Sequence, residues 1–378
     1  MRLQGARLRE NRIHGSGLER GDAVREHGII IHNGSVLTKK QIPTPALLVD
    51  LDLLESNLAR MAERAKESGK KLRPHAKAHK CVEIARRQIE LGACGISVAT
   101  VAEAELMAKN GIPGILLTSP LGDPAKIARV VATGAMAVVD HVRQVEWYED
   151  AASRPIDLLI DIDVGDHRTG ASTATQALEI ARAIRRSRHL RLRGLQAYSV
   201  SGSHGATPDE RKHISAAAFQ TATEIRDLLA KEGFSIEILS GGSTGSWDID
   251  LELPDVTELQ VGSYVMMDLA YRRIGIDFQN AMTILATVVS ANHDAFVTVD
   301  AGFKAFSTDR GYGPEPAHFA AAYRWGGDEF GFLDTKLDLG ERVEFIAPHC
   351  DPTVNLYGKI YACRGDSVEA IWAVMERS

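Results

Sequence analysis

The sequence lacks any long hydrophobic run. No apolar stretch approaches the roughly 18 residues that a membrane-spanning helix requires, and the first residues have no apolar core of the kind found in a signal peptide. Only four cysteines are present (Cys81, Cys94, Cys350 and Cys363), and none has CxxC spacing. We therefore expect reduced thiols in a cytoplasmic protein. The net charge of −6 argues against nucleic acid or an acidic membrane surface as partners.

What is present indicates a globular chain of about two domains, because 378 residues with 44% hydrophobic and 25% charged residues exceed one ordinary core. Eight short apolar runs alternate with segments of helical length, which predicts a parallel sheet. The runs are 72–79, 95–99, 114–118, 136–140, 158–164, 192–199, 236–240 and 258–264. Eight such units favour a (β/α)8 (TIM) barrel. The alternative is a doubly wound open sheet, which usually has fewer units.

The pattern changes after about residue 276, where strand-like segments follow one another without long helices. We predict a barrel domain over 50–275, and a β-rich second domain built from 28–49 and 276–378. Residues 1–27 would form an N-terminal extension. The Gly/Pro-rich loop 308–334 is predicted to line an entrance or an interface.

The segment LRPHAKAHK, at residues 72–80, carries the strongest functional pattern. Alternation along a strand would place four basic residues on one face: Arg73, His75, Lys77 and His79. Barrel strands usually fill the interior with aliphatic side chains, so four inward cations would be costly without anionic partners. The alternative is an edge strand with its basic face in water, but the opposite face is small and gives little to bury.

Lys77 would lie at the carboxyl end of a barrel strand, where barrel active sites form. Lysine forms a Schiff base with pyridoxal phosphate. We expect the flanking cations to lower its pKa and so favour the nucleophilic amine.

The run PHAKAHK resembles the PH-x-K-T-H-K motif of D-threonine aldolases and eukaryotic-type D-serine dehydratases, with Ala78 in place of the threonine. These are alanine racemase-like, fold-type III pyridoxal-phosphate enzymes, and the resemblance extends over about residues 43 to 375. It implies a barrel with a β-rich domain, pyridoxal phosphate on Lys77, a role for His75 in binding the cofactor, and a homodimer.

Two glycine- and hydroxyl-rich segments follow the seventh and eighth predicted strands. Such segments bring backbone N–H groups and hydroxyls toward an anion, and barrels often bind a phosphate at this position. The predicted phosphate-binding residues are Ser240, Gly241, Gly242, Ser243, Thr244, Gly262, Ser263 and Tyr264. A flexible turn would explain the first segment equally well, but the resemblance implies that it binds the cofactor phosphate.

Two further cofactor contacts are predicted beyond the fifth and sixth strands. Arg168, in DIDVGDHRTG, matches the family arginine beside the pyridine ring; the alternative is a loop arginine paired with Asp163 or Asp166. Tyr198 should point into the barrel mouth and pack on the cofactor, unless it is a core tyrosine.

The segment PHCDPTVN contains a His-x-Asp pair, His349 and Asp351, whose side chains would point the same way from an extended chain. An imidazole and a carboxylate suit a divalent ion acting as a Lewis acid. We predict Mn²⁺, with Co²⁺, Mg²⁺ or Zn²⁺ as alternatives. The resemblance matters here because D-threonine aldolases carry His-x-Asp, whereas the related D-serine dehydratases carry His-x-Cys. Cys350 is expected to point away.

His204 follows Tyr198 by six residues, as a histidine does in D-threonine aldolases, where it acts as a base for the substrate hydroxyl. The alternative is a loop histidine without a role. Together these features predict a lyase that cleaves D-β-hydroxy-α-amino acids such as D-threonine into glycine and an aldehyde. The alternatives are a D-3-hydroxyaspartate aldolase, a dehydratase acting on D-serine or D-3-hydroxyaspartate by β-elimination, a racemase, and a non-catalytic pyridoxal-phosphate carrier.

Overall fold

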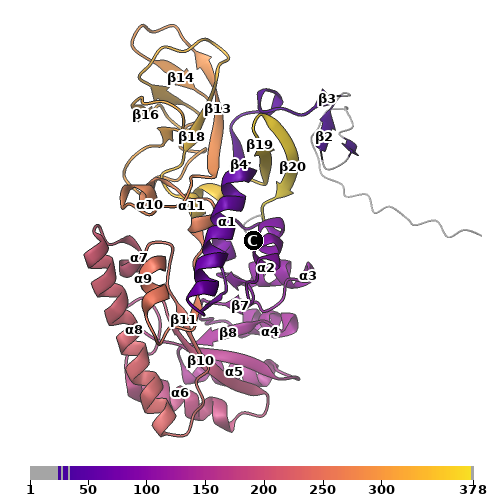
Figure 1. Ribbon diagram of the computed structural model, residues 1–378. Coiled ribbons are helices and arrows are strands. Elements are labelled where there is room, and N and C mark those ends of the chain that lie inside the picture. Colours follow the sequence, from indigo (N-terminus) through magenta and orange to yellow (C-terminus); the bar gives the residue numbers. More distant parts are fainter. Residues whose placement is uncertain (1–23, 27–28, 33–34, 376–378) are drawn as a thin grey trace, which may run out of the picture.

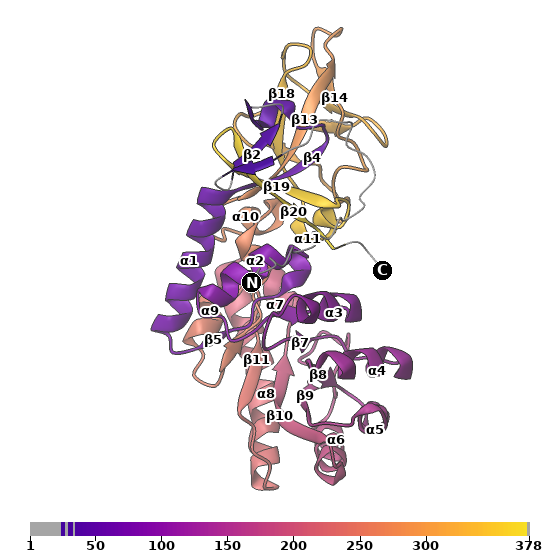
Figure 2. The same ribbon diagram turned by 90° about the vertical axis from the view of Figure 1, so that its right-hand side faces the viewer.

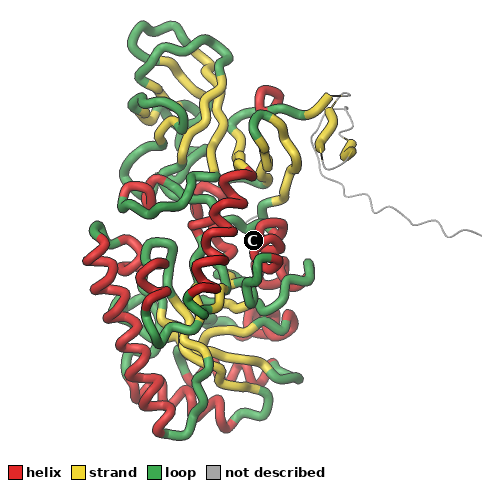
Figure 3. The backbone as a smooth tube through the Cα atoms, in the orientation of Figure 1, coloured by secondary structure: helices red, strands yellow, loops and turns green. Residues whose placement is uncertain are grey.

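The computed structural model describes residues 24–26, 29–32 and 35–375, so the predicted extension 1–27 lies almost entirely outside the described residues. Figures 1 and 2 show two parts, one above the other. Helices surround strands in the lower part, whereas the upper part consists mainly of strands and loops (Figure 3). Within the described ranges, no helix is both long enough and apolar enough to cross a membrane.

The lower part is a barrel of eight parallel strands, as the sequence predicted. In spatial order the strands are β5 (Lys71–Leu72), β12 (Glu258–Leu259), β11 (Ile238–Gly241), β10 (Leu190–Ala197), β9 (Ile156–Asp161), β8 (Met136–Val139), β7 (Leu116–Leu117) and β6 (Ser97–Val98). A parallel bridge between His75 and Ser97 joins the first strand to the last. The carboxyl ends of all eight strands therefore meet at one mouth.

Helices cover the outside of the barrel because each turns an apolar stripe toward the strands. In α1 (Leu51–Glu67), Leu51, Leu54 and Leu58 are buried at helical spacing, and Asp50 caps the first turn by accepting from two backbone N–H groups. The other helices of this part are α2 (Val82–Glu90), α3 (Val101–Lys109), α4 (Pro124–Thr133), α5 (Val142–Ala151), α6 (Ala174–Arg186), α7 (Val200–His204), α8 (Pro208–Lys231) and α9 (Trp247–Glu252).

The upper part is a nine-stranded sheet that combines both ends of the chain. β4 (Ala46–Asp50) lies between β13 (Met282–Ser290), to which it is antiparallel, and β19 (Lys359–Arg364), to which it is parallel. The remaining strands are β14 (Val297–Val299), β15 (Glu315–Pro316), β16 (Tyr323–Trp325), β17 (Gly331–Leu333), β18 (Arg342–Ile346) and β20 (Ser367–Ala373). This agrees with the predicted β-rich second domain; the exact domain boundaries stay a prediction.

Short elements lie between and beside the two sheets. The 3-10 helices are η1 (Lys39–Gln41), η2 (Ala76–Ala78) and η3 (Ser263–Val265), and two single-turn helices are α10 (Leu269–Arg273) and α11 (Cys350–Val354). Figures 1 and 2 both place α10 and α11 where the upper part meets the barrel mouth. A small sheet of β1 (Val24–Glu26), β2 (Ile29–His32) and β3 (Ser35–Val36) precedes them all.

Candidate active site

The lysine segment does not continue as a strand, and the expectation of one shared basic face is wrong. β5 ends at Leu72, and Ala76–Ala78 form η2. Backbone bonding toward β12 continues as far as His75, because the N–H groups of Arg73 and His75 donate to the carbonyls of Leu259 and Val261, and it ends where η2 begins. Arg73 therefore points away from Lys77, and its guanidinium forms a two-pronged contact with Glu258 (2.8 Å each), with both side chains buried.

Lys77 lies in η2 at the barrel mouth. Its Nζ lies 5.4 Å from the centre of the Tyr198 ring. Burial lowers the pKa of Lys77, but Tyr198 and the Asp351 carboxylate outweigh burial, so the pKa stands above the usual lysine value. The expectation of a lowered pKa is wrong, because a carboxylate faces this amine together with the cations.

His75 turns both ring nitrogens to protein partners. Nδ1 accepts from the backbone N–H of Lys77 (3.3 Å), and Nε2 lies 3.0 Å from Thr118 Oγ1. Burial, followed by the charge of Lys77, holds the pKa of His75 well below its usual value. A neutral, fixed imidazole therefore lies beside Lys77.

Arg168 and Tyr198 lie together at the same mouth. The Arg168 guanidinium is 5.1 Å from the Tyr198 ring centre. The two candidate partners of Arg168 are engaged elsewhere: Asp163 bonds His167 (2.8 Å), and Asp166 accepts from the backbone N–H of Val200 (2.5 Å). Tyr198 and Arg168 line the Lys77 cavity, which is the placement that a cofactor role requires.

Four of the predicted phosphate-binding residues line this cavity: Ser243, Thr244, Gly262 and Ser263. The backbone N–H groups of Thr244 and Ser263 have no hydrogen-bond partner among the described residues. A Cβ at Gly262 would lie 3.0 Å from the His75 carbonyl oxygen, so glycine fits this close approach with the least displacement of its neighbours. Free N–H donors at a glycine-lined edge fit a phosphate group.

The remaining predicted phosphate residues direct their side chains elsewhere. Ser240 donates to Glu258 (2.8 Å) inside the barrel, and the buried Tyr264 hydroxyl accepts from Gln88 Nε2 (3.2 Å). Gly241 and Gly242 have no side chain to contribute, and a Cβ at Gly242 would meet the Asp250 carboxylate. The geometry therefore argues against side-chain contacts to a cofactor from Ser240 and Tyr264.

His349 and Asp351 face each other across the same cavity, with Nε2 and Oδ2 4.0 Å apart. The segment is not extended as expected, because His349 caps α11 and Asp351 lies in its first turn. Asp309 accepts from His349 Nδ1 (2.7 Å), which leaves the Nε2 lone pair facing the cavity. Two donors on one ion can lie up to about 4.2 Å apart, so the pair fits a divalent ion.

The described residues contain no group of three or more metal-ligating side chains around an ion-sized space, so any protein ligation here would be sparse. Cys350 does not point away as expected: its thiol lies 3.1 Å from Asp351 Oδ2, which also accepts from Ser263 Oγ (3.0 Å). Burial raises the pKa of Asp351, but Lys77 and His349 outweigh burial and keep the pKa below its usual value.

His204 lies at the end of α7 and stacks on Tyr271, with ring centres 5.2 Å apart. Its Nε2 is 3.2 Å from a terminal nitrogen of Arg310, which is also 3.4 Å from His349 Nε2. Burial, followed by the charge of Arg310, lowers the pKa of His204 to about 4. His204 is therefore neutral at pH 7, and its Nε2 lone pair accepts the N–H of Arg310.

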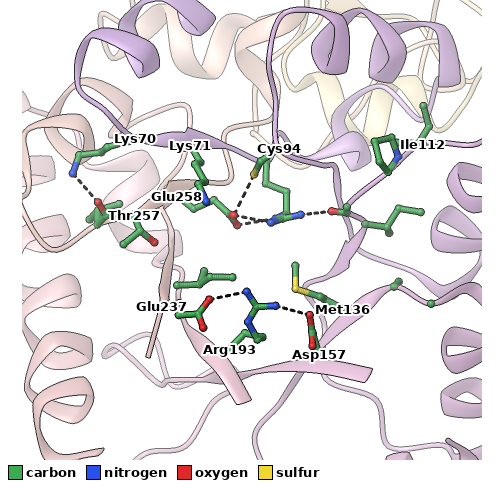
Figure 4. A pocket seen from close by; sticks show the side chains of 18 of the residues that line it. Lys70, Lys71, Cys94, Ile112, Met136, Asp157, Arg193, Glu237, Thr257 and Glu258 are labelled. Atoms are coloured by element: carbon green, nitrogen blue, oxygen red, sulfur yellow. Dashed lines mark hydrogen bonds and ion pairs between the residues drawn. The ribbon is translucent and has the colours of Figure 1, made fainter. Parts of the chain in front are cut away.

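The cavities around Lys77 differ in kind from a larger cavity at the other end of the barrel. Two adjoining cavities of ≈ 350 and ≈ 290 Å³ share His75, Lys77, Arg168 and Tyr198. The larger cavity, ≈ 990 Å³, lies where the strands begin. There Arg193 is held between Asp157 and Glu237, as Figure 4 shows. Charges that already pair with one another offer little to a ligand, so the Lys77 cavities are the candidate site.

Sequence reasoning missed two charged residues of this site, Asp309 and Arg310. Both lie in the loop that was predicted to line an entrance or an interface, and no motif marks them. They reach the site because the β-rich part lies over the barrel mouth, which local sequence patterns do not show. Tyr271, packed on His204, was also missed, because no motif marks it.

Family models and solved structures identify the class of protein to which this chain is similar. The family model "Alanine racemase, N-terminal domain" matches residues 49–270, and "Putative serine dehydratase domain" matches residues 281–363. The structure of D-threonine aldolase from Filomicrobium marinum is similar, with a TM-score of 0.86, 34% identity, and coverage of 90% of this chain and 97% of that one. The structure of D-threo-3-hydroxyaspartate dehydratase from Delftia sp. HT23 has a TM-score of 0.82 at 26% identity, with 90% and 100% covered.

Among relatives compared by sequence, the D-threonine aldolase of Arthrobacter sp. is 36% identical, covering 89% of this chain and 93% of the relative. The 3-hydroxy-D-aspartate aldolase of Paracoccus denitrificans (strain Pd 1222) is 34% identical, covering 90% and 94%. The chain belongs to this alanine racemase-like family of pyridoxal-phosphate-dependent, fold-type III enzymes, which includes D-threonine aldolases, 3-hydroxy-D-aspartate aldolases and D-serine dehydratases.

Proposed function

We propose that this protein is a divalent-metal-assisted lyase that cleaves the Cα–Cβ bond of D-β-hydroxy-α-amino acids, giving glycine and an aldehyde. The observation that carries the proposal is the convergence of Lys77, His204, His349 and Asp351 on one cavity at the barrel mouth. The carboxylate at position 351 favours the aldolase, because the related dehydratases that the sequence resembles carry a thiol there.

Lys77 would hold the cofactor through Nζ, with Tyr198 packed beside it and Arg168 over the tyrosine ring. Thr244, Gly262 and Ser263 would bind its phosphate through the donors described above. Bound pyridoxal phosphate supplies an electron sink for the pair released at Cα. Arg168 cannot donate a proton to a ring nitrogen at neutral pH, so the sink would rely on the ring's other contacts.

His349 and Asp351 would hold the ion, with Asp309 fixing the imidazole. A divalent ion supplies a Lewis acid for the substrate hydroxyl; Mn²⁺ is our first choice, with Co²⁺, Mg²⁺ or Zn²⁺ as alternatives. The neutral His204 would accept the hydroxyl proton at Nε2. Lys77, whose raised pKa keeps a proton on Nζ, would return a proton to Cα after the bond breaks.

The test incubates purified protein with pyridoxal phosphate, Mn²⁺ and D-threonine or D-3-hydroxyaspartate, and assays glycine, aldehyde and 2-oxo acid together. Glycine with aldehyde, lost on addition of EDTA and in Asp351→Asn, would support the proposal. A 2-oxo acid without glycine would replace it with the dehydratase. No product, with the cofactor still reducible onto Lys77 by borohydride, would favour the carrier or another substrate.

A further inference from the structure

Arg310 presents a positive charge to the active-site cavity without a carboxylate partner of its own. It lies in the loop between β14 and β15 and lines the cavity together with Lys77 and Asp351. The nearest carboxylate, Asp309, is 3.5 Å from Arg310 Nε but is already bonded to His349 Nδ1 at 2.7 Å. The Nε–H is buried and has no hydrogen-bond partner among the described residues.

The other close neighbours of Arg310 are imidazole nitrogens, of His204 at 3.2 Å and His349 at 3.4 Å. Imidazole nitrogens do not neutralise a guanidinium. The buried Arg73, by contrast, binds both oxygens of Glu258 at 2.8 Å. A guanidinium fork that is mostly buried, and whose nearest carboxylate is bonded to a histidine, is suited to a carboxylate brought by a ligand.

The position of Arg310 indicates which part of the substrate it meets. Under the proposed function, His204 and the His349–Asp351 pair surround the substrate hydroxyl on Cβ. Arg310 contacts both histidines, so it lies beside the other substituent of Cβ rather than beside the amine held near Lys77. A methyl group, as in threonine, would leave the fork unpaired.

We propose that Arg310 binds a carboxylate on Cβ, so that the preferred substrates are D-β-hydroxy amino dicarboxylates of the 3-hydroxyaspartate type. This inference rests on the proposed function and deepens it. The Cα–Cβ bond breaks with its electron pair going to Cα, the hydroxyl proton passes to the site base, and a proton is returned to Cα. The products are glycine and an aldehyde that keeps the second carboxylate, glyoxylate.

A second observation concerns the route into the site. A cavity of ≈ 720 Å³ that also reaches Lys77 and Asp351 is lined by Lys80, Lys126 and Arg129, and by the carboxylate Glu103. Arg129 is paired with Glu105, but Lys80 contacts the neutral amide of Asn355. Although the chain has a net charge of −6, the lysines and arginine that line this cavity outnumber its two carboxylates, which favours the approach of an anion.

The test compares wild type, Arg310→Met and Arg310→Lys in cleavage of D-3-hydroxyaspartate and D-threonine. We expect the ratio of kcat/KM for the two substrates to fall by about 10- to 100-fold in Arg310→Met. Arg310→Lys should recover only part of this ratio, because lysine lacks the fork. The surface variant Arg324→Met, whose arginine pairs with Asp334, should leave the ratio unchanged.

A binding measurement separates this inference from the proposed function. D-Aspartate and D-alanine lack the hydroxyl, and their binding to the holoenzyme can be followed by cofactor absorbance. Tighter binding of D-aspartate in wild type, lost in Arg310→Met, supports the inference even if no aldehyde forms and the proposed function fails. Equal loss of both substrates and of both ligands would overturn it and assign Arg310 to the α-carboxylate or to structure.

Discussion

Both ends of the barrel carry cationic side chains, but those at one end are bound by carboxylates whereas those at the other face a cavity. At the amino end of the strands, Arg73 and Arg193 are bound by Glu258, Asp157 and Glu237. At the mouth, Lys77 and Arg310 face a cavity, and the carboxylates nearest to them, Asp351 and Asp309, also contact His349. Cations that are satisfied within the protein contribute to the fold, whereas cations left facing a cavity are available to a ligand. The comparison predicts that substitutions at the two ends separate stability from activity.

Replacing Lys77 should have the largest effect on activity and little effect on folding. Lys77→Ala removes the amine that would hold the cofactor, so lyase activity should fall by about 10³-fold or more. Borohydride reduction should fix the cofactor to wild type and not to the variant. Lys80→Ala is the matched control, since this lysine of the same segment bonds Asn355 and should leave the reducible attachment intact. Retention of reducible cofactor in Lys77→Ala would contradict the assignment.

Substitutions at the amino end of the strands should lower stability and leave activity nearly unchanged. Glu258→Gln leaves the buried Arg73 without its counter-charge, and breaking a buried pair in this way typically costs about 3–5 kcal/mol of unfolding free energy. Denaturant unfolding measures the loss, while kcat of the remaining folded enzyme should stay close to wild type. Glu105→Gln, which removes the exposed partner of Arg129, should unfold at nearly the wild-type denaturant concentration. If Glu258→Gln is as stable as wild type, the pair is not structural.

The sequence could predict the barrel, its eight strands and the β-rich second part because apolar periodicity is a local property. It could also pick out Lys77, His349 and Asp351, since short motifs carry them. It failed to place the lysine segment correctly, because alternation was assumed to continue beyond His75 into what is a 3-10 turn. It missed Arg310, because only the approach of a distant loop to the barrel mouth brings this residue to His204.

The contact between Asp309 and His349 allows metal binding to be tested separately from cofactor binding at the barrel mouth. Asp309→Asn removes the carboxylate that fixes His349, and loss of such an outer contact typically weakens metal affinity by about 10- to 100-fold. Calorimetric titration with Mn²⁺ measures the affinity, and excess Mn²⁺ should restore part of the activity. Asp328→Asn, a substitution on the surface of the same part of the molecule, should bind Mn²⁺ as wild type does. Equal affinities in all three proteins would argue against an ion on His349.

His79 provides the smallest and most specific test, because it is a buried titratable group that lines neither of the two cavities shared by Lys77 and Tyr198. It is fully buried, and burial lowers its pKa to about 4. An unfolded histidine titrates near about 6.5, so the unfolded chain binds more protons between pH 4 and 6.5. The stability that His79 contributes is therefore present above pH 6.5 and is lost as the pH falls toward 4.

The difference in unfolding free energy between wild type and His79→Gln should consequently shift by roughly 2 kcal/mol between pH 7 and pH 5, with wild type losing more. Comparing the two proteins at each pH cancels the opposite trend of Asp161 and Asp250, since burial raises the pKa values of these carboxyls to about 6 and about 7. Identical pH dependence in both proteins would mean that His79 does not remain neutral in the fold. His79 would then be a further charged side chain, buried below the barrel mouth, that the comparison of the two ends leaves out.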